Sequence, residues 1–205
     1  MLKFLSMLIL MWRVLAKVPT DEERKTILEC HTKLREHVNP PASNMLLLNY
    51  SVEMEHLAVK YFADCRPPIN REPFRGTSNL LMIGRSEKSR SVQELCKVNG
   101  NFYDYEKDQC SGPCLVHNLM VWASAAEVGC ASKVCPNEFD SSKSKYALVC
   151  IYKLSDPCLT GRPYDKGKSC SRCPDGYGCL RNQCYKGEPI TTLVDMTTTP
   201  IGTVV

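Results

Sequence analysis

Thirteen cysteines constrain this 205-residue chain more than any other feature of its sequence. All thirteen lie at or beyond Cys30, after an apolar N-terminal run. In a secreted chain, cysteines in such number favour a disulfide framework, because oxidising compartments preserve these bonds. The odd count leaves at least one thiol free or joined to a second molecule.

The N-terminus is typical of a secretory signal peptide. Residues 4–15 are apolar except for Ser6 and Arg13, follow Lys3, and lead to Ala16 at the expected cleavage position. A membrane anchor would need about 20 uninterrupted apolar residues, so we interpret residues 1–16 as a signal peptide. The sequence therefore predicts an extracellular protein that does not span a membrane.

The charge of the chain gives no support for nucleic-acid binding. Removing a leader that contains Lys3 and Arg13 lowers the formal net charge from +4 to +2. The remaining basic residues are dispersed along the chain, whereas a nucleic-acid surface needs them clustered. We therefore expect no nucleic acid among the partners.

Two helices are indicated near the N-terminus. Thr20-Asp-Glu-Glu23 has the form of a capping box, and apolar residues follow at helical spacing until Pro40. A second apolar stripe begins after the potential cap Ser51 and ends at Pro67-Pro68. Residues 91–98 form a weaker helix candidate.

Strand-like runs occupy residues 116–123, 127–134 and 146–153. Helices beside a small sheet predict an α/β fold. After Leu154 the composition changes, since residues 158–184 hold five cysteines and almost no aliphatic side chains. Such a segment must be held by disulfides. From Thr191 the tail is Thr-rich, which predicts disorder and allows O-glycosylation.

The segment from Cys114 to Cys130, Cys-Leu-Val-His-Asn-Leu-Met-Val-Trp followed by Val-Gly-Cys, resembles a signature of the CAP superfamily of cysteine-rich secretory, venom-allergen and plant pathogenesis-related proteins. Further matches are His31–Arg35 with Val38–Met45, Leu57–Cys65 and Leu148–Tyr152. The segment from Gly161 to Cys184 resembles the hinge of the glioma-pathogenesis-related and parasitic-worm venom-allergen-like branches. The resemblance implies an α-β-α sandwich over residues 17–154, a cysteine-rich hinge over 155–186 and a tail over 187–205.

The same family carries two His and two Glu in a cavity, a set that can hold a divalent metal. Residues 66–78 contain no histidine for the first position. By resemblance, Ser78 and Val98 replace the two glutamates, and Val116 replaces the second histidine. His117 lies one register away, which in a strand would point it to the opposite face. We expect no metal and no cofactor.

Catalysis is not expected either. A nucleophile needs a base within hydrogen-bond reach and a group that orients the base. The histidines are His31, His37, His56 and His117, and none lies in a nucleophile motif. We interpret His31 and His37 as hydrogen-bonded structural histidines.

The resemblance also implies disulfide pairs. They are Cys65–Cys135, Cys130–Cys150, Cys170–Cys179 and Cys173–Cys184. Cys110 and Cys114 bracket a short loop and are expected to pair with each other. Cys30 and Cys96 are then expected to be buried thiols. Cys158 becomes the candidate for an intermolecular bridge and a disulfide dimer, although a bridge from Cys158 to Cys30 or Cys96 stays open.

One glycosylation sequon is clear, Asn49-Tyr-Ser51, in an expected loop before the second helix. Two functions remain open. The first is a secreted, non-catalytic protein that binds another extracellular protein at a host or intercellular interface, through its hinge and loops. The alternative is a sterol- or fatty-acid-binding protein, with the apolar stretches Leu80–Ile83 and Met45–Leu48 lining the ligand site.

Overall fold

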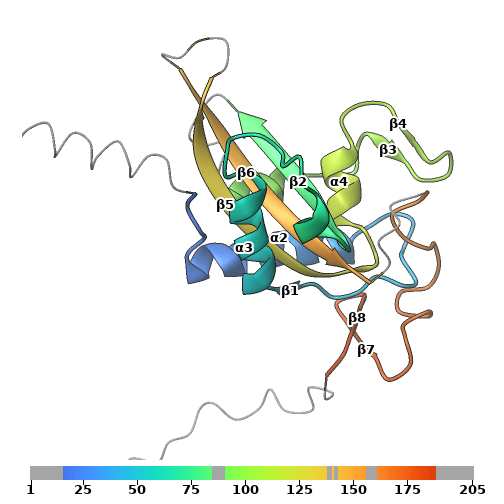
Figure 1. Cartoon of the computed structure of the whole chain (residues 1–205). Coiled ribbons are helices and arrows are strands. Elements are labelled where there is room, and N and C mark those ends of the chain that lie inside the picture. The colour runs from blue at the N-terminus through green and yellow to red at the C-terminus, as the bar shows by residue number, and fades with distance from the viewer. Residues whose placement is uncertain (1–15, 85–90, 138–139, 141–142, 156–160, 188–205) are drawn as a thin grey trace, which may run out of the picture.

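The computed structural model describes residues 16–84, 91–137, 140, 143–155 and 161–187. Within them a four-stranded sheet separates two helical layers, and α2 and α3 lie on opposite faces of the sheet (Figure 1). The predicted α-β-α sandwich is confirmed. The predicted signal peptide, the tail and Cys158 lie outside the described residues. No helix in the described part of the chain is long and apolar enough to cross a membrane.

The sheet has the strand order β1-β5-β6-β2. The strands are β1 (Asn49–Tyr50), β2 (Thr77–Gly84), β5 (Ala125–Pro136) and β6 (Ser144–Leu154). β1 runs parallel to β5, whereas β6 is antiparallel to both of its neighbours. The predicted strands 127–134 and 146–153 fall within β5 and β6, and β2 extends well beyond the short apolar stretch that the sequence indicated.

α2 (Asp21–Glu36) begins at the predicted capping box. The Thr20 hydroxyl accepts from the Glu23 backbone N–H at 3.2 Å, and the Glu23 carboxylate accepts from the Thr20 N–H at 2.8 Å. These bonds satisfy donors that the first helical turn leaves free. The buried face of α2 carries Ile27 and Cys30, which pack on the sheet.

Alternation along β6 supplies both faces of the sheet. Leu148, Cys150 and Tyr152 belong to the cluster shared with α2, η3 (Val92–Lys97) and α4 (Leu115–Met120). Ala147, Val149 and Ile151 belong to the cluster shared with α3 (Val52–Tyr61) and η1 (Glu72–Phe74). β6 is therefore buried on both faces, which explains its nearly continuous apolar sequence.

The predicted strand 116–123 is wrong, because residues 115–120 form α4. The Asn118 N–H donates to the Cys114 carbonyl at 2.9 Å, which closes a helical turn. Val116, Leu119 and Met120 then lie at helical spacing and contact the α2-side cluster. Apolar runs this short do not distinguish a helix from a strand by periodicity, so the packing of α4 on the sheet decides the conformation.

Hinge residues 161–186 pack against the sandwich. They include β7 (Gly178–Leu180) and β8 (Gln183–Tyr185). The Cys184 N–H donates to the Met45 carbonyl at 2.7 Å, and the Leu47 N–H donates to the Cys184 carbonyl at 2.8 Å. Arg181 forms ion pairs with both Glu29 and Glu36 of α2. The short hairpin of β3 (Tyr103–Asp104) and β4 (Gln109–Cys110) lies before α4.

A second set of contacts joins the hinge to the loop after β3. Tyr105 stacks on Tyr164 with ring centroids 4.9 Å apart, and its hydroxyl donates to the Tyr164 carbonyl at 2.9 Å. Arg162 donates to the Tyr105 carbonyl at 2.9 Å. Bonds at both ends of segment 161–186 fix this part of the hinge on the domain.

Gly129 sets how closely α3 approaches β5. A Cβ at this position would lie 2.1 Å from the Glu55 nitrogen and 2.5 Å from the Ser51 carbonyl oxygen. Both are backbone atoms of the first turn of α3 and its cap, so they cannot move without shifting the helix. Only glycine fits between this helix and the sheet.

We therefore expect Gly129→Ala to lower the free energy of unfolding by about 1–3 kcal/mol, the usual cost of overpacking. Urea denaturation followed by circular dichroism measures the loss. Gly187→Ala is the control, because its added methyl would meet only the Tyr185 ring at 3.2 Å. Equal stability of the two variants would contradict the close packing of α3.

Candidate functional site

By family resemblance, three residues of this chain stand at positions where the family has a ligand, and all three lie on the α2 side of the sheet. Val98 directly follows η3, Val116 lies in α4, and both pack against the α2-side cluster. Ser78 is buried in β2, two residues from Leu80 of the same cluster, so alternation places it on this face. The structure thus assigns the three residues to one region, where their side chains supply one hydroxyl and no imidazole or carboxylate.

Among the described residues, a single set of three or more His, Cys, Asp or Glu side chains lies close enough together to hold a metal ion, namely Cys170, Cys173 and Cys184. All three are disulfide-bonded, so none offers a thiolate. The donor sets of the described residues therefore do not fit the family's metal.

His117 is the imidazole nearest in sequence to the replaced histidine position. It lies in α4, not in the expected strand. A shift of one position along a helix rotates the direction of the side chain by about 100°, whereas in a strand it would reverse the face. Its Nδ1 lies 2.9 Å from the Asn118 Oδ1, and its ring packs against Gly100. Burial lowers the pKa of His117. The ring acts as a packing element between α4 and the loop after η3.

His31 is completely buried in α2, and both of its ring nitrogens have partners. Nδ1 lies 2.7 Å from the Ile27 carbonyl oxygen, which only accepts, so Nδ1 carries the proton. Nε2, 2.8 Å from the Tyr152 hydroxyl, is then the acceptor. Burial lowers the pKa of His31 to about 4. A neutral histidine with both nitrogens bonded joins α2 to β6, as a structural histidine would.

Arg35 is a cation in the same interior, with 1 % of its surface exposed. Its guanidinium donates to the carbonyl oxygens of Leu46 at 2.6 Å and of Met120 and Trp122 at 2.9 Å. Met120 ends α4, so the charge lies at the negative end of that helix. Arg35 thereby joins α2 to α4 and to the loop before β1.

An ion pair between the half-buried Arg24 and the buried Glu55, together with Tyr50, joins α2, α3 and β1. The Arg24 guanidinium donates to both carboxylate oxygens of Glu55, at 2.9 and 2.8 Å. The Tyr50 hydroxyl donates to the same carboxylate at 2.5 Å. Burial is the main cause that raises the pKa of Tyr50. Sequence analysis missed this cluster, because Arg24 and Glu55 are 31 residues apart and no local pattern links them.

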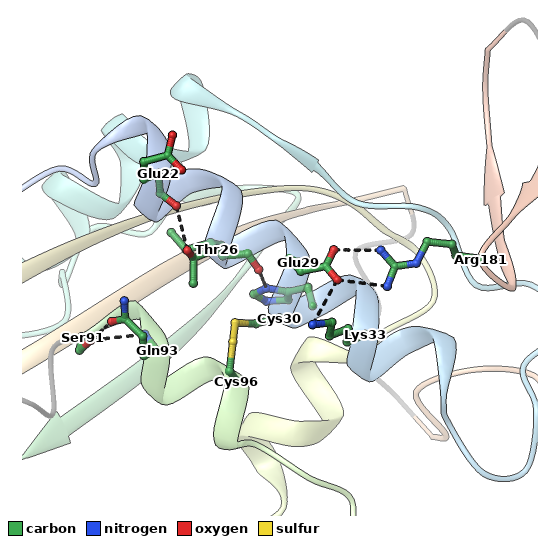
Figure 2. Close-up of a disulfide and its surroundings, with 11 residues drawn as sticks. Glu22, Thr26, Glu29, Cys30, Lys33, Ser91, Gln93, Cys96 and Arg181 are labelled. Atoms are coloured by element: carbon green, nitrogen blue, oxygen red, sulfur yellow. Dashed lines mark hydrogen bonds and ion pairs between the residues drawn. A yellow bond between two sulfur atoms is a disulfide. The ribbon is translucent and has the colours of Figure 1, made fainter. Parts of the chain in front are cut away.

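Cys30 and Cys96 form a disulfide that joins α2 to η3 (Figure 2). The expectation that they are separate buried thiols is wrong. Val92 and Leu95 of η3 pack into the α2-side cluster together with Ile27. This packing places the two Cα atoms 4.7 Å apart, within the range for a disulfide. One residue earlier on α2, the Glu29 carboxylate contacts both Arg181 and Lys33 (Figure 2).

Five further disulfides are present, and they use the cysteines paired in the sequence analysis. They are Cys65–Cys135, Cys110–Cys114, Cys130–Cys150, Cys170–Cys179 and Cys173–Cys184. Cys65–Cys135 joins the segment after α3 to β5, and Cys130–Cys150 joins β5 to β6. With Cys30–Cys96, every cysteine in the described part of the chain is bridged. A dimer through Cys158 stays a prediction.

Asn49 of the sequon lies in β1, where a loop was expected. Its side chain is exposed at the outer strand of the sheet. The Ser51 hydroxyl of the sequon caps α3 by accepting from the Met54 N–H at 3.4 Å. The amide that would carry a glycan is therefore accessible, and occupancy stays a prediction.

Comparison with known proteins gives one family. The model described as the cysteine-rich secretory protein family, CAP, matches residues 28–152. Human cysteine-rich secretory protein LCCL domain-containing 1 is 33 % identical over 186 residues, covering 82 % of this chain and 37 % of the relative. Human peptidase inhibitor 16 is 31 % identical over 177 residues, covering 83 % and 37 %. The chain thus spans little more than a third of the length of these two relatives.

Among solved structures, the one described as NaASP2 with Zn²⁺ is similar in fold. Its TM-score is 0.60 at 18 % sequence identity, covering 80 % of this chain and 96 % of that chain. At this identity the similarity concerns the fold alone.

The stability of the protein is expected to depend on pH through His31. In the unfolded chain a histidine has its ordinary pKa of 6.5, whereas burial lowers the pKa of His31 in the folded chain to about 4. Between these pH values the unfolded chain binds more protons, so the free energy of unfolding falls as pH drops, by up to about 1.4 kcal/mol per unit.

Urea denaturation between pH 7.5 and 4.5 measures this slope, and His31→Gln should flatten it. His37→Gln, at the exposed histidine that caps the C-terminus of α2, is the matched control. An unchanged slope in His31→Gln would contradict the assignment of this pH dependence to His31.

Loss of the Cys30–Cys96 bridge is expected to cost more stability than loss of Cys110–Cys114. The two bridges close loops with sequence separations of 66 and 4 residues. Loop-closure entropy then predicts losses of about 4 and about 2 kcal/mol for the paired Cys→Ala variants. Denaturation in guanidinium under non-reducing conditions measures both. A larger loss from the short loop would contradict this order.

Proposed function

The chain belongs to the cysteine-rich secretory protein family, and we propose that it is a secreted, non-catalytic protein that acts by binding another protein at a host or intercellular interface. The relatives named for secretion and the six disulfides support an extracellular location. Both fit a chain whose first residues have the pattern of a signal peptide.

The observation that carries this proposal is that the three positions which, by family resemblance, hold cavity ligands are occupied in this chain by Ser78, Val98 and Val116. Valine can neither bind a metal nor transfer a proton, and both valines here pack against the α2-side cluster. Ser78 is buried and lies in a strand with no titratable side chain. A relative whose structure is described with Zn²⁺ shares the fold, but these three positions of the present chain do not supply such ligands.

The polar groups of the interior also support a non-catalytic role. His31 uses both ring nitrogens to join α2 and β6, and the Arg35 guanidinium donates to five backbone carbonyls. The Glu55 carboxylate is held by Arg24 and Tyr50. A catalytic base must be able to reach a substrate proton, and these groups are directed to the protein itself. Function is therefore assigned to the surface.

The surface suits protein binding because it is held rigidly. Disulfides fix the end of α3, η3 and the loop before α4, while Arg181 fixes the hinge on α2. A preorganised surface loses little conformational entropy when it binds. Large apolar side chains that are exposed on it include Ile69, Ile83 and Leu115.

Lipid binding is the second candidate, and one cavity favours it. A hollow of about 220 Å³ lies between the segment after α3 and the sheet, lined in part by Phe62, Leu81 and Ile83. Typical ligand pockets measure about 300–1,000 Å³, and this hollow reaches that size only together with a second hollow of about 360 Å³ that shares three of its lining residues. In the two apolar stretches that were expected to line a lipid site, Leu80, Met45 and Leu48 are core residues. Lipid binding therefore ranks second.

Native mass spectrometry and organic extraction of the purified secreted chain separate the two functions. We expect the mass of the bare, deglycosylated polypeptide, no stoichiometric lipid in the extract, and saturable binding to cell-surface proteins by cross-linking. Reduced and alkylated protein is the control, because it has lost the disulfide-held surface. Stoichiometric lipid without saturable protein binding would reject the first function in favour of the second.

A further inference from the structure

β2 is an unusually open edge of the sheet. It pairs with β6 on one side, and the order β1-β5-β6-β2 leaves its other side without a strand among the described residues. Its sequence over Thr77–Gly84 contains no charged residue and no proline. Edge strands are normally shortened, charged or interrupted by proline, because free backbone groups invite pairing with another chain. β2 has none of these protections.

The hydrogen-bond register identifies which backbone groups point outward. Cys130 and Cys150 face each other across β5 and β6 with Cα atoms 4.0 Å apart, the spacing of a pair without mutual backbone bonds. The N–H and C=O of Cys150 therefore point to β2, where Leu80 is the partner. The bond from the Leu154 N–H to the Gly76 carbonyl gives the same register.

It follows that the even-numbered residues of β2 bond to β6. The N–H and C=O groups of the odd-numbered residues point away from the sheet, and these residues are Thr77, Asn79, Leu81 and Ile83. Within the described part of the chain, no backbone bond from another segment reaches these groups. They form a row of donors and acceptors ready for a further strand.

The opposite edge of the sheet is different. β1 has two residues, and the loop before it is already bonded to the hinge through Met45 and Leu47. Asn49, the residue of the sequon, lies in that strand, so a glycan there would cover it. Of the two edges, only β2 offers a long run of outward backbone groups that no backbone bond from another described segment reaches.

An apolar groove lies beside this edge. By alternation, the side chains of Leu81 and Ile83 are on the α3 side of the sheet, where they line the 220 Å³ hollow together with Phe62 and Pro67. A second hollow of about 360 Å³ shares Asp64, Arg66 and Pro67 with the first and continues to Ile69. Ile83 is 53 % exposed and Ile69 is fully exposed.

The groove carries more positive than negative charge. Among the described residues, its lining includes the cations Lys60 and Arg66 and a single carboxylate, that of Asp64. Opposite charge steers association and fixes register. The groove therefore favours a segment that combines apolar side chains with an acidic one.

We propose that the β2 edge and this groove bind an extended, acidic segment of a partner protein, which adds to the sheet as a strand beside β2. Backbone bonds to Asn79, Leu81 and Ile83 would supply affinity, as in other cases of strand addition. An apolar side chain would enter the hollow between Phe62 and Ile83, and an acidic one would lie beside Arg66. This inference rests on the proposed function and names the surface and the kind of partner.

Selection from a displayed library of short random peptides against the purified full chain tests the proposal. We expect enrichment of peptides that alternate apolar and other residues next to an acidic position. Amide hydrogen exchange of the complex should show new protection at Asn79, Leu81 and Ile83. Leu80 and Met82, already bonded to β6, should change little. Enriched peptides that leave these amides unprotected would overturn the proposal, as would no enrichment.

Ile83→Glu is the blocking variant, since it places a carboxylate at the mouth of the hollow, where it repels an acidic segment, without removing a bond to β6. It should weaken peptide binding by about tenfold or more, the effect of losing a well-packed contact. Val52→Glu is the matched control, because Val52 is 52 % exposed and lies outside the groove lining. Both variants should keep the wild-type unfolding midpoint. Equal weakening by the two variants would reject the groove.

Other outcomes assign the edge to another occupant. A concentration-dependent dimer that Ile83→Glu converts to a monomer would replace the peptide with a second copy of this chain. Capture of a cell-surface protein that Ile83→Glu does not reduce would leave the proposed function standing and reject this edge as its site. Peptide binding at the edge without any cell-surface partner would support the edge as a binding site and reject the proposed function.

Discussion

The antiparallel ladder between β5 and β6 supports both helical layers, because each layer packs on side chains that these two strands present. β6 directs Cys150 and Tyr152 to the α2 side, and Val149 and Ile151 to the α3 side. The bridge Cys130–Cys150 joins facing residues of the ladder and so fixes its register. A slip of one residue would exchange the two faces and bury the wrong set of side chains.

Polar groups buried around this ladder determine how the helices are placed on it. The His31 ring joins α2 to β6, Arg35 joins α2 to α4, and the pair Arg24–Glu55 joins α2 to α3. Each group would be costly to bury without partners, so each admits few alternative arrangements. α2 takes part in all three contacts and also carries Cys30 and the hinge anchor Glu29. These polar side chains thus serve to position the helices on the sheet.

Much of this architecture could be predicted from local sequence, and the remainder depended on contacts between distant segments. The capping box at Thr20, both long helices and the two central strands follow from caps and periodicity. α4 was predicted as a strand, because Val116–Ala123 is short and apolar and its conformation is set by packing on the sheet. Cys30–Cys96 required the packing of η3 on α2, which no local pattern encodes. For the candidate site, the positions of Ser78, Val98 and Val116 came from a family resemblance, whereas the outward register of β2 required the structure.

The two faces of the sheet differ in how they are filled. On the α2 side, Val98 and Val116, which stand at ligand positions by family resemblance, pack against the core. On the α3 side, the bridge Cys65–Cys135 joins the segment after α3 to β5, and both cysteines line the hollow beside β2. Leu81 and Ile83 line the same hollow and belong to the strand at the edge of the sheet. The proposed partner segment would therefore meet an apolar hollow and outward backbone groups on one strand, and the disulfide would hold one wall of that hollow in place.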